Sequence, residues 1–349
     1  MQTNQTKLLD GLISIYLKSL ILIEFGVFGG GSWATALVKI LTDNKLLVNW
    51  YIKRSLQAQA IEKTGYNPDY LNLVSLDTRY IRTLSNIQQT AQRSKALLFA
   101  VPSAQLPTLL DHFESDWITD KIVISTIKGT VGPYYDIPTD VIATYFSVDH
   151  QQQAILAGPC HAEEVGLGKK TYLTIASPNA EIQELLSACF NTNYMHVQSC
   201  HDIRGVSYAA IYKNVVGIVC GMAKGLRYGD NFIAVLVANA LHEMSNMLQS
   251  IGSVQPILNS SYAGDLLVTA YSEHSRNRTF GELIGRGYSV EKAKRSMQMV
   301  AEGYGATQGL YQTVQQLPAD FPILQAAYRV LFKHMPASTE FKLLEQKLK

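Results

Sequence analysis

The sequence is poor in the features that mark several common classes of protein. Its four cysteines form no CxxC pair and have no histidine partner at metal-ligand spacing: Cys160, Cys189, Cys200 and Cys220. Scattered cysteines favour a reducing compartment over a secreted disulfide framework, and they do not indicate a structural zinc site. Charge is also unbiased, because the 349 residues carry a formal net charge of +2 without basic runs. We therefore expect a cytoplasmic protein with no metal and no nucleic-acid partner.

Uninterrupted apolar runs of membrane-spanning length are also lacking. The most apolar stretch, residues 11–28, is broken by Lys18 and Glu24, whereas a spanning helix needs about 20 apolar residues. The stretch lacks the basic start and small-residue cleavage site of a signal peptide. We interpret residues 21–28 as a buried first strand. Residues 1–20 then form an extension to which the sequence assigns no role.

What the sequence does contain, up to about residue 200, is an alternation of short apolar runs and amphipathic stretches. Continuous runs such as residues 96–101 are typical of strands that are buried on both faces. Alternating strands and helices predict a mostly parallel sheet covered on both sides. The predicted strands are 21–28, 46–52, 96–101, 121–125, 154–157, 172–176 and 194–197, and helices are predicted over 33–40, 104–113 and 180–190.

After about residue 202 the strand-like runs disappear and long helical patterns take over. The predicted helices are 203–226, 231–251, 289–301 and 321–332. The chain is long enough for two cores. We therefore predict an α/β fold, with a Rossmann-type, mostly parallel-sheet domain over residues 1–200 and an all-α domain over residues 201–349. A ligand cleft is expected between them, where the carboxyl ends of the strands face the second domain.

A glycine-rich turn follows the first predicted strand and opens a helix. Gly29, Gly31 and Ala34 match the pattern G-x-G-x-x-A. In such turns the first glycine permits a tight bend and the second lets the backbone approach a pyrophosphate, which the helix N-terminus attracts. The placement after a strand and before a helix favours dinucleotide binding over a merely flexible turn.

The end of the second predicted strand bears on the choice of cofactor. NAD-selective sites usually place Asp or Glu there, but this sequence has Lys53 and Arg54 and no acid. A basic pair can neutralise a 2′-phosphate, which predicts that NADPH is accepted and leaves open whether it is preferred to NADH. A solvated charge pair in a loop is the alternative interpretation.

Small residues and one lysine recur every four positions along the first predicted helix of the second domain, in the row Ala209, Lys213, Gly217, Gly221 and Gly225. Residues spaced in this way share one ridge of a helix. The ridge predicts either close packing against another helix or a groove in which a substrate lies beside Lys213. Further along, Asp265 and Thr269 share one helical face by the same spacing.

A candidate phosphate site lies in the run Ser275-Arg-Asn-Arg278. Thr279 and Glu282, which directly follow, match a capping box and predict that a helix begins there. Arg276 would then lie near a helix N-terminus, with hydroxyl and amide donors beside it. A guanidinium, neutral donors and a positive helix end together suit a phosphate, and a plain surface loop is the alternative.

From about residue 23 to residue 345 the chain resembles the bacterial-type NAD(P)-dependent glycerol-3-phosphate dehydrogenases. Matching stretches occur along most of its length: Gly29-Gly-Gly-Ser-Trp33, Val101-Pro-Ser103, Thr126-Ile-Lys-Gly129, Ala157-Gly-Pro-Cys-His-Ala-Glu-Glu-Val165, Lys213-Asn-Val215, Gly229-Asp-Asn231, Gly264-Asp-Leu266, His274-Ser-Arg-Asn-Arg278 and Ala301-Glu-Gly-Tyr304. The resemblance implies reversible reduction of dihydroxyacetone phosphate to sn-glycerol 3-phosphate by NADPH or NADH, for glycerophospholipid synthesis. It implies a small-molecule substrate and no membrane span, and it leaves a monomer and a homodimer both open.

The resemblance also implies roles for individual positions. Cofactor contacts are expected from Gly29, Gly31, Ser32, Trp33, Lys53, Arg54, Lys128, Ala162, Arg276, Val300 and Glu302. Substrate contacts are expected from Lys128, Gly158, Cys160, Lys213, Asp265, Ser275, Arg276 and Asn277. The catalytic group comprises Lys213, Lys128, Asp265, Asn214 and Thr269, with Lys213 as the proton donor and Asp265 favouring its charged form.

Several positions depart from the family pattern, among them Phe28-Gly29-Gly30, where Ile-Gly-Ala is more usual. Cys160 stands where many members carry Ser, Ala34 where Gly is usual, and Ser207 where an acid is common. Cys160 could alter substrate contacts and Ser207 could disturb helix packing. Two other functions are considered: a β-hydroxyacid dehydrogenase of related architecture, and a non-catalytic sensor that binds NADPH. The run Ser275-Arg-Asn277 argues against the first, and the intact lysines argue against the second.

Overall fold

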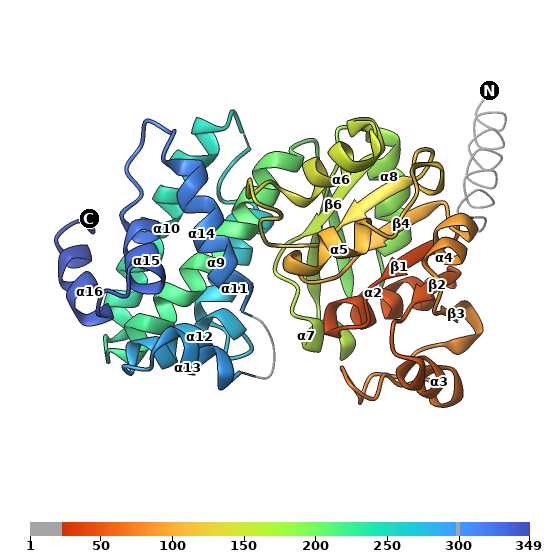
Figure 1. Cartoon of the computed structure of the whole chain (residues 1–349), viewed down its shortest axis with the longest axis horizontal. Coiled ribbons are helices and arrows are strands. Elements are labelled where there is room, and N and C mark those ends of the chain that lie inside the picture. The colour runs from red at the N-terminus through yellow and green to blue at the C-terminus, as the bar shows by residue number, and fades with distance from the viewer. Residues whose placement is uncertain (1–22, 254, 298–300) are drawn as a thin grey trace, which may run out of the picture.

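The protein consists of a sheet part and a helical part that lie side by side (Figure 1). The computed structural model describes residues 23–253, 255–297 and 301–349, so the predicted extension and Val300 lie outside the described residues. The sheet part contains the strands β1 (Phe25–Phe28), β2 (Val48–Tyr51), β3 (Ile81–Leu84), β4 (Ala96–Phe99), β5 (Ile122–Ser125), β6 (Gln153–Ala157), β7 (Thr171–Ala176) and β8 (Met195–Cys200).

All eight described strands form one sheet in the order β3-β2-β1-β4-β5-β6-β7-β8. The strands from β3 to β6 pair in parallel, β6 and β7 pair antiparallel, and β7 and β8 pair in parallel. The strand order reverses between β1 and β4, which is the position where open α/β sheets bind ligands at their carboxyl ends. The predicted Rossmann-type, mostly parallel sheet is confirmed.

Helices cover both faces of this sheet because side chains from successive strand positions point to opposite sides. Phe25 and Val27 belong to one apolar cluster, with α2 (Ser32–Asp43), α7 (Ala162–Gly166) and α8 (Ala180–Phe190). Phe28 belongs to another, with α4 (Ile87–Arg93), α5 (Leu106–Leu110) and α6 (Pro138–Phe146). The helix α3 (Ser55–Thr64) follows β2.

The helical part is built around α9 (Ile203–Gly225). This helix is long and apolar enough to cross a membrane, but the whole of its apolar window is buried inside the protein. It is therefore the core helix of this part. The other described α-helices of this part are α10 (Asp230–Ser250), α11 (Asp265–Tyr271), α12 (Arg276–Gly285), α13 (Val290–Arg295), α14 (Glu302–Val314), α15 (Pro322–Phe332) and α16 (Ala337–Glu345), and a short π-helix, Ser260–Gly264, precedes α11.

Glycines let α9 and α12 approach each other closely. A Cβ atom added to Gly221 or Gly225 would collide with backbone of α12, and one added to Gly281 or Gly285 would collide with backbone of α9. A helix-interior glycine costs about 0.5–1 kcal/mol relative to alanine, and the close contact explains why these are kept. The ridge predicted from the sequence thus serves helix packing at Gly221 and Gly225. At Gly217 it borders Thr269 and Asn277 instead.

Three element predictions were wrong in detail. The strand β3 was missed, because Ile81–Leu84 is half exposed at the sheet edge and forms no apolar run. The helix predicted over 289–301 is α13, which ends at Arg295, and α14 begins at Glu302. The helix predicted over 104–113 is a 3-10 turn followed by the short α5, which has a proline in its first turn.

Candidate functional site

One cavity of about 910 Å³ runs along the carboxyl ends of the parallel strands and is closed by the helical part. Most of the residues predicted for the site line it, namely Gly29, Gly31, Ser32, Trp33, Lys53, Arg54, Lys128, Cys160, Ala162, Lys213, Asn214, Thr269, Ser275, Arg276, Asn277 and Glu302. Asp265 and Gly158 lie behind this lining, where both accept hydrogen bonds from Lys128. The structure therefore brings together predicted residues that follow four strands, β1, β2, β5 and β6, and predicted residues from four helices of the helical part, α9, α11, α12 and α14.

The glycine turn is fixed at one end of the cavity by side chains from neighbouring elements. The indole Nε1 of Trp50 donates to the Gly29 carbonyl at 2.6 Å, and Gln57 Nε2 donates to the Gly30 carbonyl at 2.8 Å. Gly29 has φ = 134°, a conformation that side chains disfavour, and an added Cβ would also strike the Ala100 carbonyl. Gly31 faces open space at the N-terminus of α2.

The turn has the properties that a dinucleotide pyrophosphate requires. An open backbone at Gly31 leaves room for phosphate oxygens, and the first N–H groups of α2 have no side-chain cap. Two ring nitrogens at the cavity, Trp33 Nε1 and His161 Nε2, are buried without a hydrogen-bond partner. Such orphaned groups favour a polar ligand, so these residues fit a nicotinamide dinucleotide.

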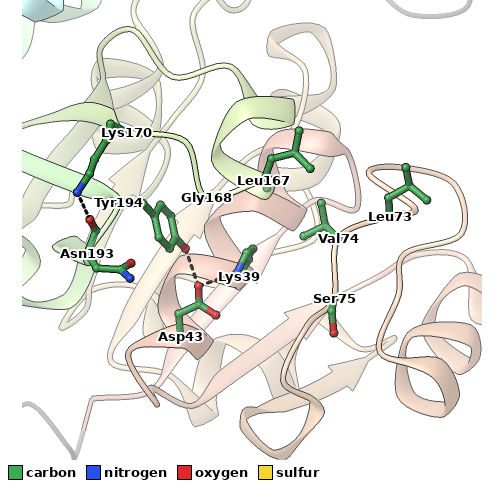
Figure 2. Close-up of a pocket in the computed structure, with 11 residues that line it drawn as sticks. Lys39, Asp43, Leu73, Val74, Ser75, Leu167, Gly168, Lys170, Asn193 and Tyr194 are labelled. Atoms are coloured by element: carbon green, nitrogen blue, oxygen red, sulfur yellow. Dashed lines mark hydrogen bonds and ion pairs between the residues drawn. The ribbon is translucent and has the colours of Figure 1, made fainter.

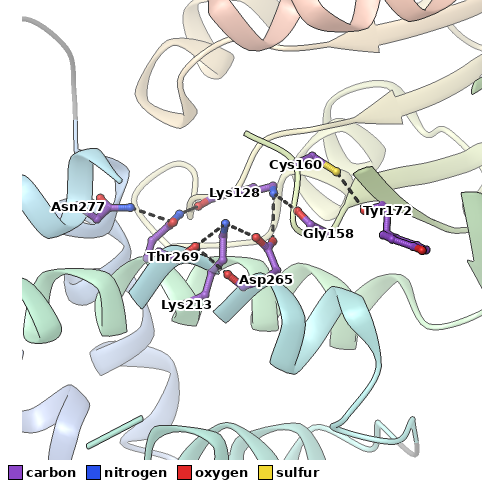
Figure 3. Close-up of polar contacts among 9 residues, drawn as sticks. Lys128, Gly158, Cys160, Tyr172, Lys213, Asp265, Thr269 and Asn277 are labelled. Atoms are coloured by element: carbon purple, nitrogen blue, oxygen red, sulfur yellow. Dashed lines mark hydrogen bonds and ion pairs between the residues drawn. The ribbon is translucent and has the colours of Figure 1, made fainter. Parts of the chain in front are cut away.

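At the far end of the cavity the lysine cluster is built around one buried carboxylate (Figure 3). Asp265 Oδ1 accepts from Lys213 Nζ at 2.6 Å, and Asp265 Oδ2 accepts from Lys128 Nζ at 3.1 Å. Lys213 also donates to Thr269 Oγ1 at 3.0 Å, and Lys128 to the Gly158 carbonyl at 3.2 Å. Asp265 is 1% exposed and Lys213 is 7% exposed. Two ammonium groups thus share one carboxylate, which leaves the cluster with a net positive charge.

Burial and charge act differently on the two lysines. Burial lowers the pKa of Lys213 to about 8; Asp265 opposes this, and the charge of Lys128 adds to it. Burial is also the largest single influence on Lys128 and acts in the same direction, but attraction to Asp265, the Cys160 thiol and the hydrogen bonds with Asp265 and Lys213 together outweigh it and raise the pKa of that lysine. Burial would raise the pKa of Asp265, yet the two lysines hold it below its usual value. Asp265 favours the charged form of Lys213 as expected, but desolvation determines the net direction.

A chain of amides links this cluster to α12 and α14. Asn214 Nδ2 donates to the Lys128 carbonyl at 2.8 Å, and Asn277 Nδ2 donates to Asn214 Oδ1 at 2.9 Å. Asn277 Oδ1 then accepts from the N–H of Gly303, in the first turn of α14, at 2.9 Å. Because each amide is held from both sides, Asn214 and Asn277 keep fixed orientations beside Lys213.

The predicted capping box at Thr279 and Glu282 was wrong. The helix α12 begins at Arg276, and Ser275 is its N-cap, with its Oγ accepting from the N–H of Arg278. Ser275 offers the same hydroxyl chemistry as Thr279 but has no acid three residues later, so the motif rule selected the wrong residue. The correction places Arg276 and Asn277 in the first turn of the helix.

The sequence patterns did not identify several residues that the structure places at the site. The carboxylate of Glu302 accepts from Ser103 Oγ at 2.6 Å and from its N–H at 3.3 Å, which joins the two parts beside the cavity. Ser103 belongs to a stretch that matched the family but received no role. His161 and His274 also line the cavity, with ring centroids 6.1 Å apart. Both histidines lie in stretches that match the family, and this was the feature of the sequence that could have marked them as site residues.

The departures from the family pattern are accommodated locally. Cys160 Sγ donates to the carbonyl of Tyr172 at 3.1 Å, and burial raises the pKa of this thiol to about 12. It is therefore neutral and not a nucleophile. Ser207 is buried, and its hydroxyl donates to the Ile203 carbonyl at 2.7 Å, so the packing of α9 is not disturbed.

A second hollow, of about 660 Å³, lies away from this site between α2 and the segments that precede β7 and β8 (Figure 2). Its charged groups are already satisfied. Asp43 accepts from Lys39 and from the Tyr194 hydroxyl, both at 2.7 Å, and Lys170 donates to the Asn193 carbonyl. We assign no function to it. Among the described residues, no group of three or more His, Cys, Asp or Glu side chains is placed to hold a metal ion.

Comparison with known proteins gives consistent results for both parts. A family model described as NAD-dependent glycerol-3-phosphate dehydrogenase N-terminus matches residues 24–183, and one described as the C-terminus of the same enzyme matches residues 202–342. The chain is 32% identical over 323 residues to glycerol-3-phosphate dehydrogenase [NAD(P)+] of Staphylococcus carnosus, which covers 92% of this chain and 97% of the relative.

Two further relatives extend this comparison. Glycerol-3-phosphate dehydrogenase [NAD(P)+] of Chlorobium phaeobacteroides is 35% identical over 318 residues, covering 90% of this chain and 95% of the relative. The crystal structure of glycerol-3-phosphate dehydrogenase from Coxiella burnetii superposes with a TM-score of 0.85 at 23% identity, over 92% of this chain and 98% of that one. That structural likeness supports the fold.

Proposed function

Since the chain belongs to the NAD-dependent glycerol-3-phosphate dehydrogenase family, we propose that it reduces dihydroxyacetone phosphate to sn-glycerol 3-phosphate by reversible hydride transfer from NADPH or NADH. The observation that carries this proposal is a single cavity with a pyrophosphate-type turn at one end. At the other end are two lysines on a buried carboxylate, beside the first turn of α12. We also propose that the product serves glycerophospholipid synthesis.

Lys213 is proposed as the proton donor. The bound nicotinamide supplies the hydride that adds to C2 of dihydroxyacetone phosphate. As that carbon accepts the hydride, Lys213 Nζ gives a proton to the carbonyl oxygen, and it takes the proton back in the reverse direction. Its lowered pKa, about 8, suits a group that must lose and regain a proton near neutral pH. Asp265 and Thr269 orient its Nζ.

Lys128 is proposed to act through its charge. Its raised pKa keeps it protonated, and its position beside Asp265 and Gly158 directs it toward the same end of the cavity. A fixed ammonium there stabilises negative charge that develops on the substrate oxygen, or the substrate phosphate itself. Gly158 and Cys160 are proposed to border the substrate on this side.

The first turn of α12 is proposed to hold the substrate phosphate. Ser275, Arg276 and Asn277 line the cavity at the positive end of this helix. Backbone N–H groups and a guanidinium favour a dianionic ligand, and the amide chain through Asn214 fixes Asn277 relative to Lys213. Holding the phosphate in this way would place C2 of the substrate at a constant distance from Lys213.

For the cofactor we propose contacts from both parts. The expected groups are Gly29, Gly31, Ser32, Trp33, Lys53, Arg54, Lys128, Ala162, Arg276 and Glu302, and Val300, outside the described residues, stays a prediction. The division at residue 200 into a cofactor part and a substrate part is likewise proposed. We also propose a cytoplasmic location, which four free cysteines support. A homodimer is a further proposal that size measurement in solution can test.

The proposed function is tested by following NADPH and NADH oxidation with dihydroxyacetone phosphate and with unphosphorylated dihydroxyacetone. We expect turnover with the phosphate ester and little with dihydroxyacetone, because the site at α12 would be unfilled. Turnover of unphosphorylated hydroxyacids instead would indicate a β-hydroxyacid dehydrogenase. Cofactor binding without any turnover would indicate a sensor.

A further inference from the structure

An acid that the segment after β2 does not supply lies beside the exposed end of the cavity, paired with Arg54. The strand β2 is followed by Lys53 and Arg54, with no Asp or Glu where many dinucleotide sites hold the ribose hydroxyls. In the folded chain, Asp69 reaches this place from the segment after α3. Its Oδ2 lies 2.9 Å from Nη2 of Arg54, a residue that lines the cavity.

A buried amide network holds Asp69 in this position. Asn67 is fully buried, and its Oδ1 accepts from the N–H of Asp69 at 3.2 Å and from Gln57 Nε2 at 3.0 Å. Its Nδ2 donates to the Gly30 carbonyl at 3.2 Å and to Thr35 Oγ1 at 2.7 Å. The segment that carries Asp69 is therefore tied to the glycine turn and to α2, and it is not a free surface loop.

The same network fixes Arg54 between three partners. Besides Asp69, its Nη2 donates to Gln57 Oε1 at 3.3 Å, and its guanidinium lies 5.9 Å from the centre of the Tyr70 ring. Gln57 and Tyr70 both line the cavity. A cofactor phosphate that reached this guanidinium would also lie within a few ångströms of the Asp69 carboxylate.

We propose that Asp69 is a specificity-determining residue that disfavours a 2′-phosphate and so keeps NADH usable beside NADPH. This inference rests on the proposed function. The carboxylate partly neutralises Arg54 and repels a second anion, whereas it can accept hydrogen bonds from the free 2′- and 3′-hydroxyls of NADH. Asp69 would thus bind the ribose hydroxyls in place of the Asp or Glu that is absent after β2.

The test is the Asp69→Asn variant of the full chain, which keeps the shape and removes the charge. Dissociation constants for NADPH and NADH are measured by fluorescence titration without substrate. We expect the ratio Kd(NADH)/Kd(NADPH) to rise, because the variant no longer repels the 2′-phosphate. The rise should be only about three- to tenfold, because water and salt partly screen an exposed charge. The rise should shrink at high salt, and Asp69→Glu, which keeps the charge, should stay close to the unaltered protein.

Asp77→Asn is the matched control, because Asp77 also pairs with an exposed arginine, Arg79, but that arginine does not line the cavity, whereas Arg54 does. It should leave the ratio unchanged. If Asp69→Asn changes both dissociation constants equally, or neither, Asp69 does not read the 2′ position and the inference is wrong. If the unaltered protein binds neither dinucleotide, the proposed function itself fails.

Discussion

The two ends of the cavity each hold a cation paired with an aspartate, at almost the same separation but in different surroundings. Lys213 and Asp265 are 2.6 Å apart, with side chains 9% and 1% exposed. Arg54 and Asp69 are 2.9 Å apart, with side chains 57% and 38% exposed. Burial lowers the pKa of Lys213 to about 8. The separation of the charged atoms therefore does not by itself determine the effect of an ion pair; its burial matters as well.

The difference follows from solvation. Charges removed from water lose hydration that only a well-placed partner can offset, so breaking a buried pair is strongly destabilising. An exposed pair exchanges readily with water and contributes about 0–1 kcal/mol. We therefore infer that the buried end is built to tune proton transfer, whereas the exposed end biases the choice of ligand. Mutations at the two ends should differ accordingly.

The largest effect is expected at the buried end. Lys213→Ala should lower turnover by about 10²–10⁴-fold, the usual contribution of a positioned proton donor. The variant should lose stability because a buried pair is broken, but the fold and NADPH binding should persist, because Lys128 still pairs with Asp265. Alanine also suits a helix interior, and most proposed cofactor contacts lie on the sheet part. The measurement is kcat at saturating substrate, together with NADPH affinity by fluorescence titration.

Lys224→Ala provides a control on the same helix, because Lys224 pairs with Glu282 on the surface and does not line the cavity. It should leave kcat unchanged. A loss smaller than tenfold in Lys213→Ala, with the fold intact, would move the proton donor to Lys128 or to water.

A smaller but still large effect is expected at the phosphate site. Arg276→Ala should raise the KM for dihydroxyacetone phosphate by about 10–100-fold, since a hydrogen bond to a charged group contributes about 1.5–3 kcal/mol. Arg276→Lys should recover little of this, because an ammonium cannot form the two parallel hydrogen bonds of a guanidinium. Steady-state kinetics decide the matter. A near-normal KM in the alanine variant would place the phosphate elsewhere.

The pH dependence of the reaction should follow Lys213. Reduction needs its ammonium form, so kcat/KM for dihydroxyacetone phosphate should be level below the pKa of about 8 and fall tenfold per pH unit above it. Oxidation of glycerol 3-phosphate needs the neutral amine, so its kcat/KM should rise with pH through the same value. Profiles in both directions test this. Parallel profiles would contradict the assignment of Lys213.

The sequence predicted the sheet well where burial makes a pattern and poorly where it does not. Residues 96–101 read as a strand because both faces of β4 are covered, but Ile81–Leu84 at the sheet edge alternates too weakly to be recognised. Close packing of α9 on α12 could be read from the glycine spacing, although that spacing alone could not separate packing from a substrate groove.

At the site, the spacing of residues along the sequence predicted only contacts between residues that are close together in the chain. Asp265 and Thr269 were placed on one face by helical periodicity, and α11 confirms this. That Lys128 shares the same carboxylate depends on how the two parts meet, which no spacing records. Asp69 escaped prediction for the same reason, because its contact with Arg54 arises from the path of the chain after α3.

The smallest effect is expected at the exposed end, where the double variant Lys53→Ala/Arg54→Ala tests the comparison most directly. Both residues are exposed, so water screens their charges. We expect NADPH affinity to fall by about three- to tenfold and NADH affinity to change less, because only NADPH carries the 2′-phosphate. Fluorescence titration at low and high salt measures both. The loss for NADPH should diminish as salt rises, unlike the effect of Lys213→Ala on kcat, which depends on a proton donor that salt cannot screen. Equal losses for both cofactors would show that these cations bind a part common to both, such as the pyrophosphate, and do not discriminate.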